Sequence, residues 1–182
     1  MPQNGLNLLT PTSIAYTGTS ATISANGSVS FTACSVLSLN GVFSADYDNY
    51  QAVFKYTSTA VGYSTQIALS AGGTPETSAS NYYTMQRIIA DSTTVSAASF
   101  SWNYMYLTVP GSTLVNGGIA WFYGPYLTQP TAYRSVSASS INNAYINEYA
   151  ATHSLSTSYD GFRIVPASGN ISGRVAVYGM RK

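Results

Sequence analysis

The stretch FSADYDNYQAVFKYTS, residues 43–58, contains the first residues that could do chemistry. Asp46 and Asp48 are two positions apart, so on a strand they would share one face. Paired carboxylates could serve glycoside hydrolysis or bind calcium. No acidic run follows that would complete a calcium shell, and few polar or charged groups are available to line a glycosidase cleft. We therefore predict a structural corner that starts a strand, in which Asp46 and Asn49 bind backbone N–H groups and Asp48 and Tyr50 take part.

His153 and Cys34 are the other candidates for catalysis or metal binding, and each is the single residue of its type. A Ser-His-Asp triad is combinatorially available, but no G-x-S-x-G sequence marks a nucleophile. One histidine and one cysteine do not make a zinc site, and no phosphate-binding glycine loop occurs. Cys34 lies in the apolar sequence FTACSVL, which is typical of a buried, inert thiol. We expect no catalytic residue, no cofactor and no bound metal.

Aromatic side chains form two stripes. Trp102, Tyr104 and Tyr106 in FSWNYMYL would share one face of a strand, and Trp121 and Tyr123 in GIAWFYG would share another. Such stripes can stack on sugar rings, or they can fill a core or a subunit interface. Core or interface is the favoured interpretation, and all five residues remain candidates for interface or glycan contact.

The composition is poor in charge. The chain has seven Lys or Arg and six Asp or Glu, 7% of its residues, where soluble domains have roughly a quarter. A surface of hydroxyls and phenols does not keep copies of a protein apart by repulsion, so we expect self-association. Nucleic acid is excluded as a partner because the basic residues are dispersed along the chain, as the following positions show: Lys55, Arg87, Arg134, Arg163 and Arg174.

The start of the chain has neither the basic nor the apolar segment of a secretory signal, and no run approaches the ~20 apolar residues of a membrane span. Neither secretion nor membrane insertion is expected. The surface nevertheless has the composition of an exposed protein. A virion protein, assembled inside a cell and displayed outside it, would combine these properties.

The elements that must position these residues are strands. Residues 21–25 and 29–33 flank Asn26-Gly27, a strong signal for a hairpin with a type I′ turn. The second strand is expected to continue towards Leu39, before another turn at Asn40-Gly41. Residues 50–57 and 172–179 alternate with a period of two, which predicts half-buried strands.

Further strands are expected at residues 64–71, 82–90, 100–109, 118–124, 131–139, 146–155 and 161–165. Strands of this length and number predict an all-β fold, an antiparallel two-sheet sandwich of the jelly-roll kind with an N-terminal β-hairpin segment. GIAWFYG is apolar on both faces, which places it in a thick core or under a neighbouring subunit. We expect an N-terminal attachment arm and hairpin in residues 1–40 and the jelly roll in residues 41–182, with one continuous unit as the alternative.

Four longer pieces are similar to a known family: PQNGLNLLTPTSI, SVSFTACSVLSLNGVFSADYDNYQAV, WFYGPYLTQPTAYRS and GFRIVPASGNISGRVAVYGMRK. Together they resemble the small jelly-roll virion proteins of tailed bacteriophages, described as minor tail, tail fibre or head decoration proteins. The resemblance spans nearly the whole chain. Its most specific parts are F-S-x-x-Y-D-N-Y and the closing G-x-x-x-x-P-x-x-G-N-I-S-G-x-x-x-V-Y-G-x-x-K.

The resemblance implies a non-enzymatic structural protein, displayed on a virion as a homotrimer and assembled in the host cytoplasm. It supplies no active-site residues. Its expected partners are further copies of itself, other tail or capsid proteins and a host-surface glycan. A tail or fibre component that contacts the host is the first expectation, and a capsid decoration protein that stabilises the shell is the alternative. A carbohydrate-binding or carbohydrate-active module is a third function class.

Overall fold

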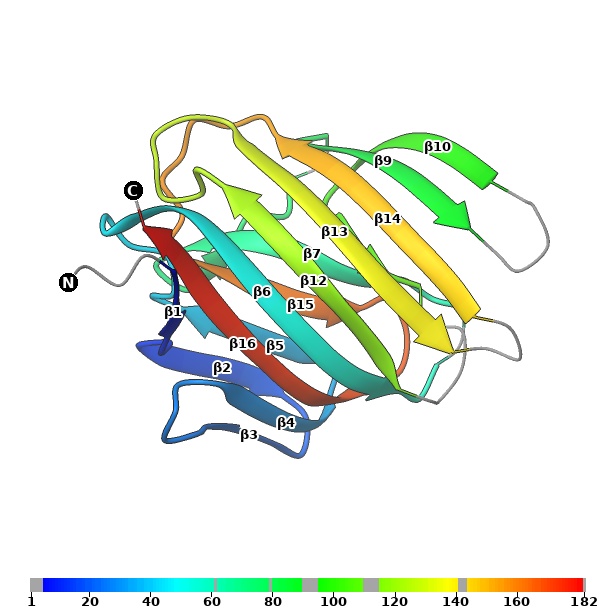
Figure 1. Ribbon diagram of the computed structural model, residues 1–182, viewed down its shortest axis with the longest axis horizontal. Helices are drawn as coiled ribbons and strands as arrows, with labels where there is room; N and C mark the ends of the chain where they lie inside the picture. Colours follow the sequence, from blue (N-terminus) through cyan, green and yellow to red (C-terminus); the bar gives the residue numbers. More distant parts are fainter. Residues whose placement is uncertain are drawn as a thin grey trace.

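The computed structural model describes residues 5–60, 62–78, 80–89, 95–109, 115–140 and 144–181. These residues form two antiparallel sheets that pack face to face (Figure 1), and they contain no helix. The larger sheet has the order β10 (Val95–Trp102), β9 (Tyr82–Ile89), β14 (Ala144–His153), β13 (Thr131–Ser140), β12 (Asn116–Tyr123), β6 (Tyr47–Ser58), β16 (Ile171–Arg181), β4 (Val29–Cys34) and β3 (Ser20–Ile23), with β1 (Leu6–Leu9) also paired to β16. The smaller sheet has the order β11 (Met105–Thr108), β7 (Thr65–Ala71), β15 (Gly161–Pro166), β5 (Val36–Asn40) and β2 (Ser13–Thr17), with β8 (Thr74–Pro75) paired to β7.

Eight of these strands have jelly-roll connectivity. In chain order, β4 pairs with β16, β5 with β15, β6 with β12 and β7 with β11, so the first half of the chain is paired, in reverse order, with the second half. Members of these four pairs alternate between the sheets, as in a jelly roll. The strands β9, β10, β13 and β14 extend the larger sheet beyond β12 (Figure 1). The expected all-β sandwich is confirmed.

The period-two pattern explains why β6 and β16 lie in the middle of the larger sheet. Tyr50 and Phe54 point into the core from β6, and Val175 does so from β16, each with at most 3% of its surface exposed. The alternate residues Val53 and Arg174 are exposed. Both strands therefore have the faces that the sequence predicts.

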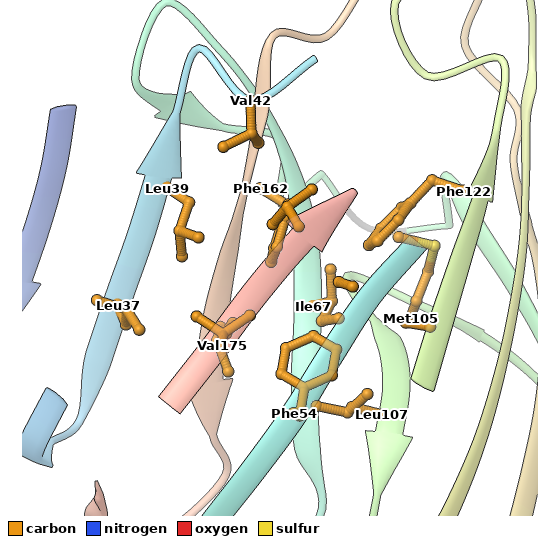
Figure 2. Packing of buried hydrophobic residues seen from close by; sticks show 14 of the residues in the cluster. Leu37, Leu39, Val42, Phe54, Ile67, Met105, Leu107, Phe122, Phe162 and Val175 are labelled. Carbon is orange, nitrogen blue, oxygen red and sulfur yellow. The ribbon is translucent and has the colours of Figure 1, made fainter. Parts of the chain in front are cut away.

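The core between the sheets is built around three aromatic rings. Phe43, Phe122 and Phe162 have ring centroids 5.2–5.8 Å apart, and each is at most 2% exposed. Figure 2 shows side chains of both layers, among them Phe122 and Phe162, pointing towards one another. Burial of three such rings makes this cluster a main source of stability.

Two expected strands are divided in the structure. Residues 29–39 bend after Cys34, and β5 passes from the larger sheet to the smaller one. Residues 100–109 are also split, because the chain bends at Asn103–Tyr104 between β10 in the larger sheet and β11 in the smaller. Trp102, Tyr104 and Tyr106 therefore do not share one face of a single strand. Alternation along a chain cannot reveal where the chain crosses between layers.

The hairpin at Asn26-Gly27 is present, but its loop differs from the predicted turn. Ile23 pairs with Val29, which leaves a loop of residues 24–28 rather than two turn residues. Within this loop only Gly27 has a positive φ, 87°. The strands β4 and β5 precede residue 40, yet they belong to the same two sheets as the later strands. Phe31 of β4 and Leu37 of β5 are buried in the same core as residues of those later strands.

Candidate functional site

The Tyr50 hydroxyl binds backbone groups at the corner before β6. The Tyr50 hydroxyl oxygen accepts a hydrogen bond from the Ser44 N–H at 2.7 Å. Its O–H can donate to the Ser44 carbonyl, at 2.7 Å, or to the Tyr47 carbonyl, at 3.0 Å. Burial raises the pKa of the Tyr50 phenol, so this donor stays protonated. Tyr50 thus ties the turn to the strand that follows it.

The two aspartates lie beside this corner. The exposed Asp46 accepts a hydrogen bond from the Ser44 hydroxyl at 3.3 Å, and its N–H donates to the same hydroxyl. The Asp48 carbonyl accepts from the Gly124 N–H at 2.8 Å, which joins the corner to the end of β12. No backbone hydrogen bond to the Asn49 side chain is seen in this described segment. The hydroxyls of Ser44 and Tyr50 thus bind backbone groups at this corner, and the capping role of Asp46 and Asn49 stays a prediction.

His153 is buried between two tyrosines. Its ring centroid lies 4.4 Å from that of Tyr82 and 5.1 Å from that of Tyr159, and the Tyr159 hydroxyl is 3.4 Å from both ring nitrogens. Burial lowers the pKa of the imidazole, which favours the neutral ring. Tyr82 also accepts from the Leu69 N–H at 3.0 Å, so this cluster joins β9 and β14 to the smaller sheet.

Cys34 is buried and unpaired, as its apolar context predicts, and burial raises the pKa of its thiol. Within the described ranges, no group of three or more His, Cys, Asp or Glu side chains could hold a metal ion. The same residues include no helix long and apolar enough to cross a bilayer.

The aromatic candidates fall into two places. Trp102 is exposed and meets Tyr106 edge to face at 6.4 Å, and Tyr106 stacks on the buried Tyr149 at 5.6 Å. Trp121 and Tyr123 do share one face, the outside of β12, where Tyr123 is 40% exposed. These two residues belong to a larger surface.

We call this surface the outer sheet face. It consists of the outward side chains of five adjacent strands, β9, β14, β13, β12 and β6, whose described members are Tyr83, Met85, Ile146, Glu148, Ala150, Thr152, Ala132, Arg134, Val136, Ala138, Ile119, Trp121, Tyr123, Asn49, Gln51, Val53 and Lys55. The side chains are mostly apolar or small, and Met85 and Tyr83 are 64% and 56% exposed. Single exposed apolar residues are ordinary, but a continuous apolar area on one face marks an interaction site.

Two of the charges on the outer sheet face form an ion pair. The Arg134 guanidinium bonds to the Glu148 carboxylate, with Nη2–Oε1 at 2.5 Å and Nε–Oε1 at 3.1 Å. Arg134 also lies over the Trp121 ring, with Cζ 5.9 Å from the centroid. Lys55, at the edge of the face, adds one exposed positive charge, so the described part of the face offers a partner few charges.

A shallow hollow of about 440 Å³ lies at one end of this face. Small residues of β13 and β14, Ala132, Ala150 and Thr152, form its floor, and Tyr83 and Met85 border it. The register explains the position, since Thr152 pairs with both Tyr83 and Ala132. Sequence reasoning missed Tyr83 and Met85, although their alternation with Tyr82 and Thr84 was a usable signal.

Comparison of the chain with models of known protein families and with curated proteins finds no match.

Proposed function

We propose that the protein is a non-enzymatic structural component of a tailed-phage virion, exposed on the particle as a homotrimer. The observation that carries the proposal is the outer sheet face, a largely apolar surface with few charges on a jelly roll. The jelly roll is an architecture of viral capsid proteins and of lectins, and because a fold alone does not define a function, the surface has to carry the argument. The family resemblance of the sequence supplies the kind of particle.

The outer sheet face is large enough to form most, though not all, of a stable contact with a second copy. Five strands about 4.8 Å apart and seven residues of about 3.4 Å each cover roughly 24 Å by 24 Å, on the order of 570 Å² before side-chain relief. A stable interface buries about 800 Å² of each partner. Trp121 and Tyr123 would lie within the interface, as aromatic residues commonly do.

A tail or fibre component that contacts the host is our first assignment, and a head decoration protein that stabilises the shell is the second. If the protein is a tail component, we expect the purified protein to bind host cells and to compete with phage adsorption. If the protein is a head decoration protein, we expect it to bind capsids from which it is missing and to raise the resistance of those capsids to heat. Host cells should then bind the protein no better than they bind a control protein. Capsid binding without competition for adsorption would overturn the tail assignment. Binding in neither assay would overturn the virion proposal.

A matched pair of variants tests the role of the outer sheet face. Met85→Lys places a charge on that face, and Tyr16→Lys places one on an exposed position of β2 in the smaller sheet. We expect Met85→Lys to weaken self-association because the ammonium would be desolvated against apolar side chains, while Tyr16→Lys leaves it unchanged. Equal effects of the two variants would contradict the assignment of this face.

A carbohydrate-binding role is the second candidate, and the hollow beside Tyr83 favours it. An exposed phenol ring can stack on a sugar, and the Thr152 hydroxyl can donate and accept hydrogen bonds. Glycan-array binding that Tyr83→Ala abolishes, in protein that stays monomeric, would favour this function over assembly.

A further inference from the structure

Two basic side chains face each other on the outside of the larger sheet. Lys55 of β6 pairs directly with Arg174 of β16, and both are exposed. Residues opposite each other have Cβ atoms about 4.5–5.5 Å apart, and like charges in such pairs destabilise a sheet. The chain has only seven Lys or Arg, and two of them lie in this electrostatically unfavourable pair.

Arg174 is held in place by neutral acceptors. Its Nε donates to the Ser28 hydroxyl at 2.7 Å and its Nη2 to the Asn26 side-chain oxygen at 3.1 Å, with a further contact from Nη2 to Ser28. Asn26 and Ser28 belong to the loop between β3 and β4, and Asn26 also binds the Ser28 hydroxyl and N–H. The guanidinium is thereby oriented while its positive charge stays uncompensated, and Nη1 has two more N–H groups to donate.

The two cations line one hollow of about 330 Å³, together with Tyr56, Thr57, Val115, Ser172 and Gly173. Gly117 lies opposite Lys55 on the other side, and a Cβ placed there would meet only the Phe54 carbonyl oxygen, at 3.8 Å. Lys55 therefore has no side chain beside it on β12, the side away from Arg174.

No carboxylate neutralises this pair among the described residues. None of the residues that line the hollow is acidic, and the acidic residue of the outer sheet face, Glu148, is bound to Arg134. The Ser172 hydroxyl accepts from the Ala33 N–H at 2.8 Å and can still donate to an oxygen ligand, whereas the Thr57 hydroxyl donates to the Ser172 carbonyl at 3.4 Å.

We propose that this hollow is a binding site for an oxyanion, a phosphate, sulfate or carboxylate group, held between the Lys55 ammonium and the Arg174 guanidinium. Arginine provides a directional fork of N–H donors and lysine a mobile point charge, a combination that suits tetrahedral and planar oxyanions. The group could belong to a free anion or to an acidic polysaccharide. The site needs residues of one chain only, so it does not depend on the assembly proposed above.

The test compares sulfate with chloride at constant ionic strength, by calorimetry and thermal melting. We expect the wild type to bind sulfate and Lys55→Gln to bind it about tenfold more weakly, because one charged hydrogen bond is lost. Arg134→Gln is the matched control, since it removes the same charge from the same sheet and is expected to leave sulfate binding unchanged. Lys55→Glu is expected to melt higher than the wild type without sulfate, because it would pair with Arg174, and to gain nothing from sulfate.

A second arm identifies the source of the anion, with alginate as a polyuronate and dextran as its neutral counterpart. Alginate binding that is tighter than sulfate binding, competed by sulfate and weakened in Lys55→Gln, supports the site with a polymer as its ligand. Sulfate binding without tighter alginate binding supports it with a free anion. No sulfate or alginate binding, or equal binding by wild type and Lys55→Gln, would overturn the proposal.

Discussion

Replacing Tyr50 by Phe tests whether a hydroxyl closes the corner between residues 44 and 50. The substitution keeps the ring, so the contact with Phe43, whose centroid lies 4.6 Å away, is retained. It removes the oxygen that accepts from the Ser44 N–H at 2.7 Å and that donates to a backbone carbonyl. The measured effect should therefore report on these hydrogen bonds.

The expected loss follows from the groups that remain. A partly buried N–H without an acceptor costs about 1–3 kcal/mol, so we expect the free energy of unfolding to fall by about 2 kcal/mol. For a domain of this size that corresponds to a melting temperature lower by about 4–8 °C. Urea titration and calorimetry measure both quantities, at one protein concentration so that any association is held constant.

Two controls separate this account from the carboxylate alternative. Tyr47→Phe removes a neighbouring hydroxyl that makes none of these hydrogen bonds, and Asp46→Ala removes an exposed acceptor of the Ser44 hydroxyl. Both should cost less than about 0.5 kcal/mol, because Asp46 is exposed and Tyr47→Phe keeps the ring that packs against the core. A Tyr50→Phe protein as stable as the wild type, or a larger loss in Asp46→Ala, would refute the account of the corner.

Three further outcomes are expected. Phe122→Ala should lower the free energy of unfolding by about 3–5 kcal/mol because it empties a fully buried site. Tyr123, the next residue, lies on the opposite face, and Tyr123→Ala should change the free energy of unfolding by less than about 0.5 kcal/mol. Chemical denaturation of the monomer measures both values. Burial lowers the pKa of His153 in the folded chain, so below the ordinary histidine pKa of 6.5 the unfolded chain binds more protons than the folded one. Stability should therefore fall as the pH drops from about 6.5 towards 5. In thermal melts at a series of pH values, His153→Gln should make this part of the pH dependence flatter. Calcium should leave the melting temperature unchanged, and a rise of several degrees that Asp48→Ala abolishes would instead show a metal site at Asp46 and Asp48.

The sequence was sufficient where a local pattern decides the structure. Alternation placed Phe54 and Val175 in the core, and turn residues located the hairpin between β3 and β4. The sequence was insufficient where the chain passes from one sheet to the other, as at Asn103. Strands of both sheets show the same alternation of buried and exposed residues, so the pattern does not mark the crossing. The loop of residues 24–28 differs from the predicted turn because Ser24 and Ser28 close it with their own backbone hydrogen bond.

The surface features depend on contacts between distant parts of the chain. Lys55 and Arg174 are dispersed in the sequence, and only the register of β6 on β16 makes them neighbours. Likewise, Tyr83 gains its place beside Ala132 through β14, which lies between their strands. Such pairings depend on strand order, which no single segment encodes.

The mass of the purified protein at micromolar concentration tests most directly whether the outer sheet face is an assembly surface. We predict a particle of three times the 19.3 kDa subunit mass, by mass photometry and light scattering, and a shift towards the subunit mass in Met85→Lys but not in Tyr16→Lys. A wild-type protein that remains a 19.3 kDa monomer throughout this concentration range would contradict the account.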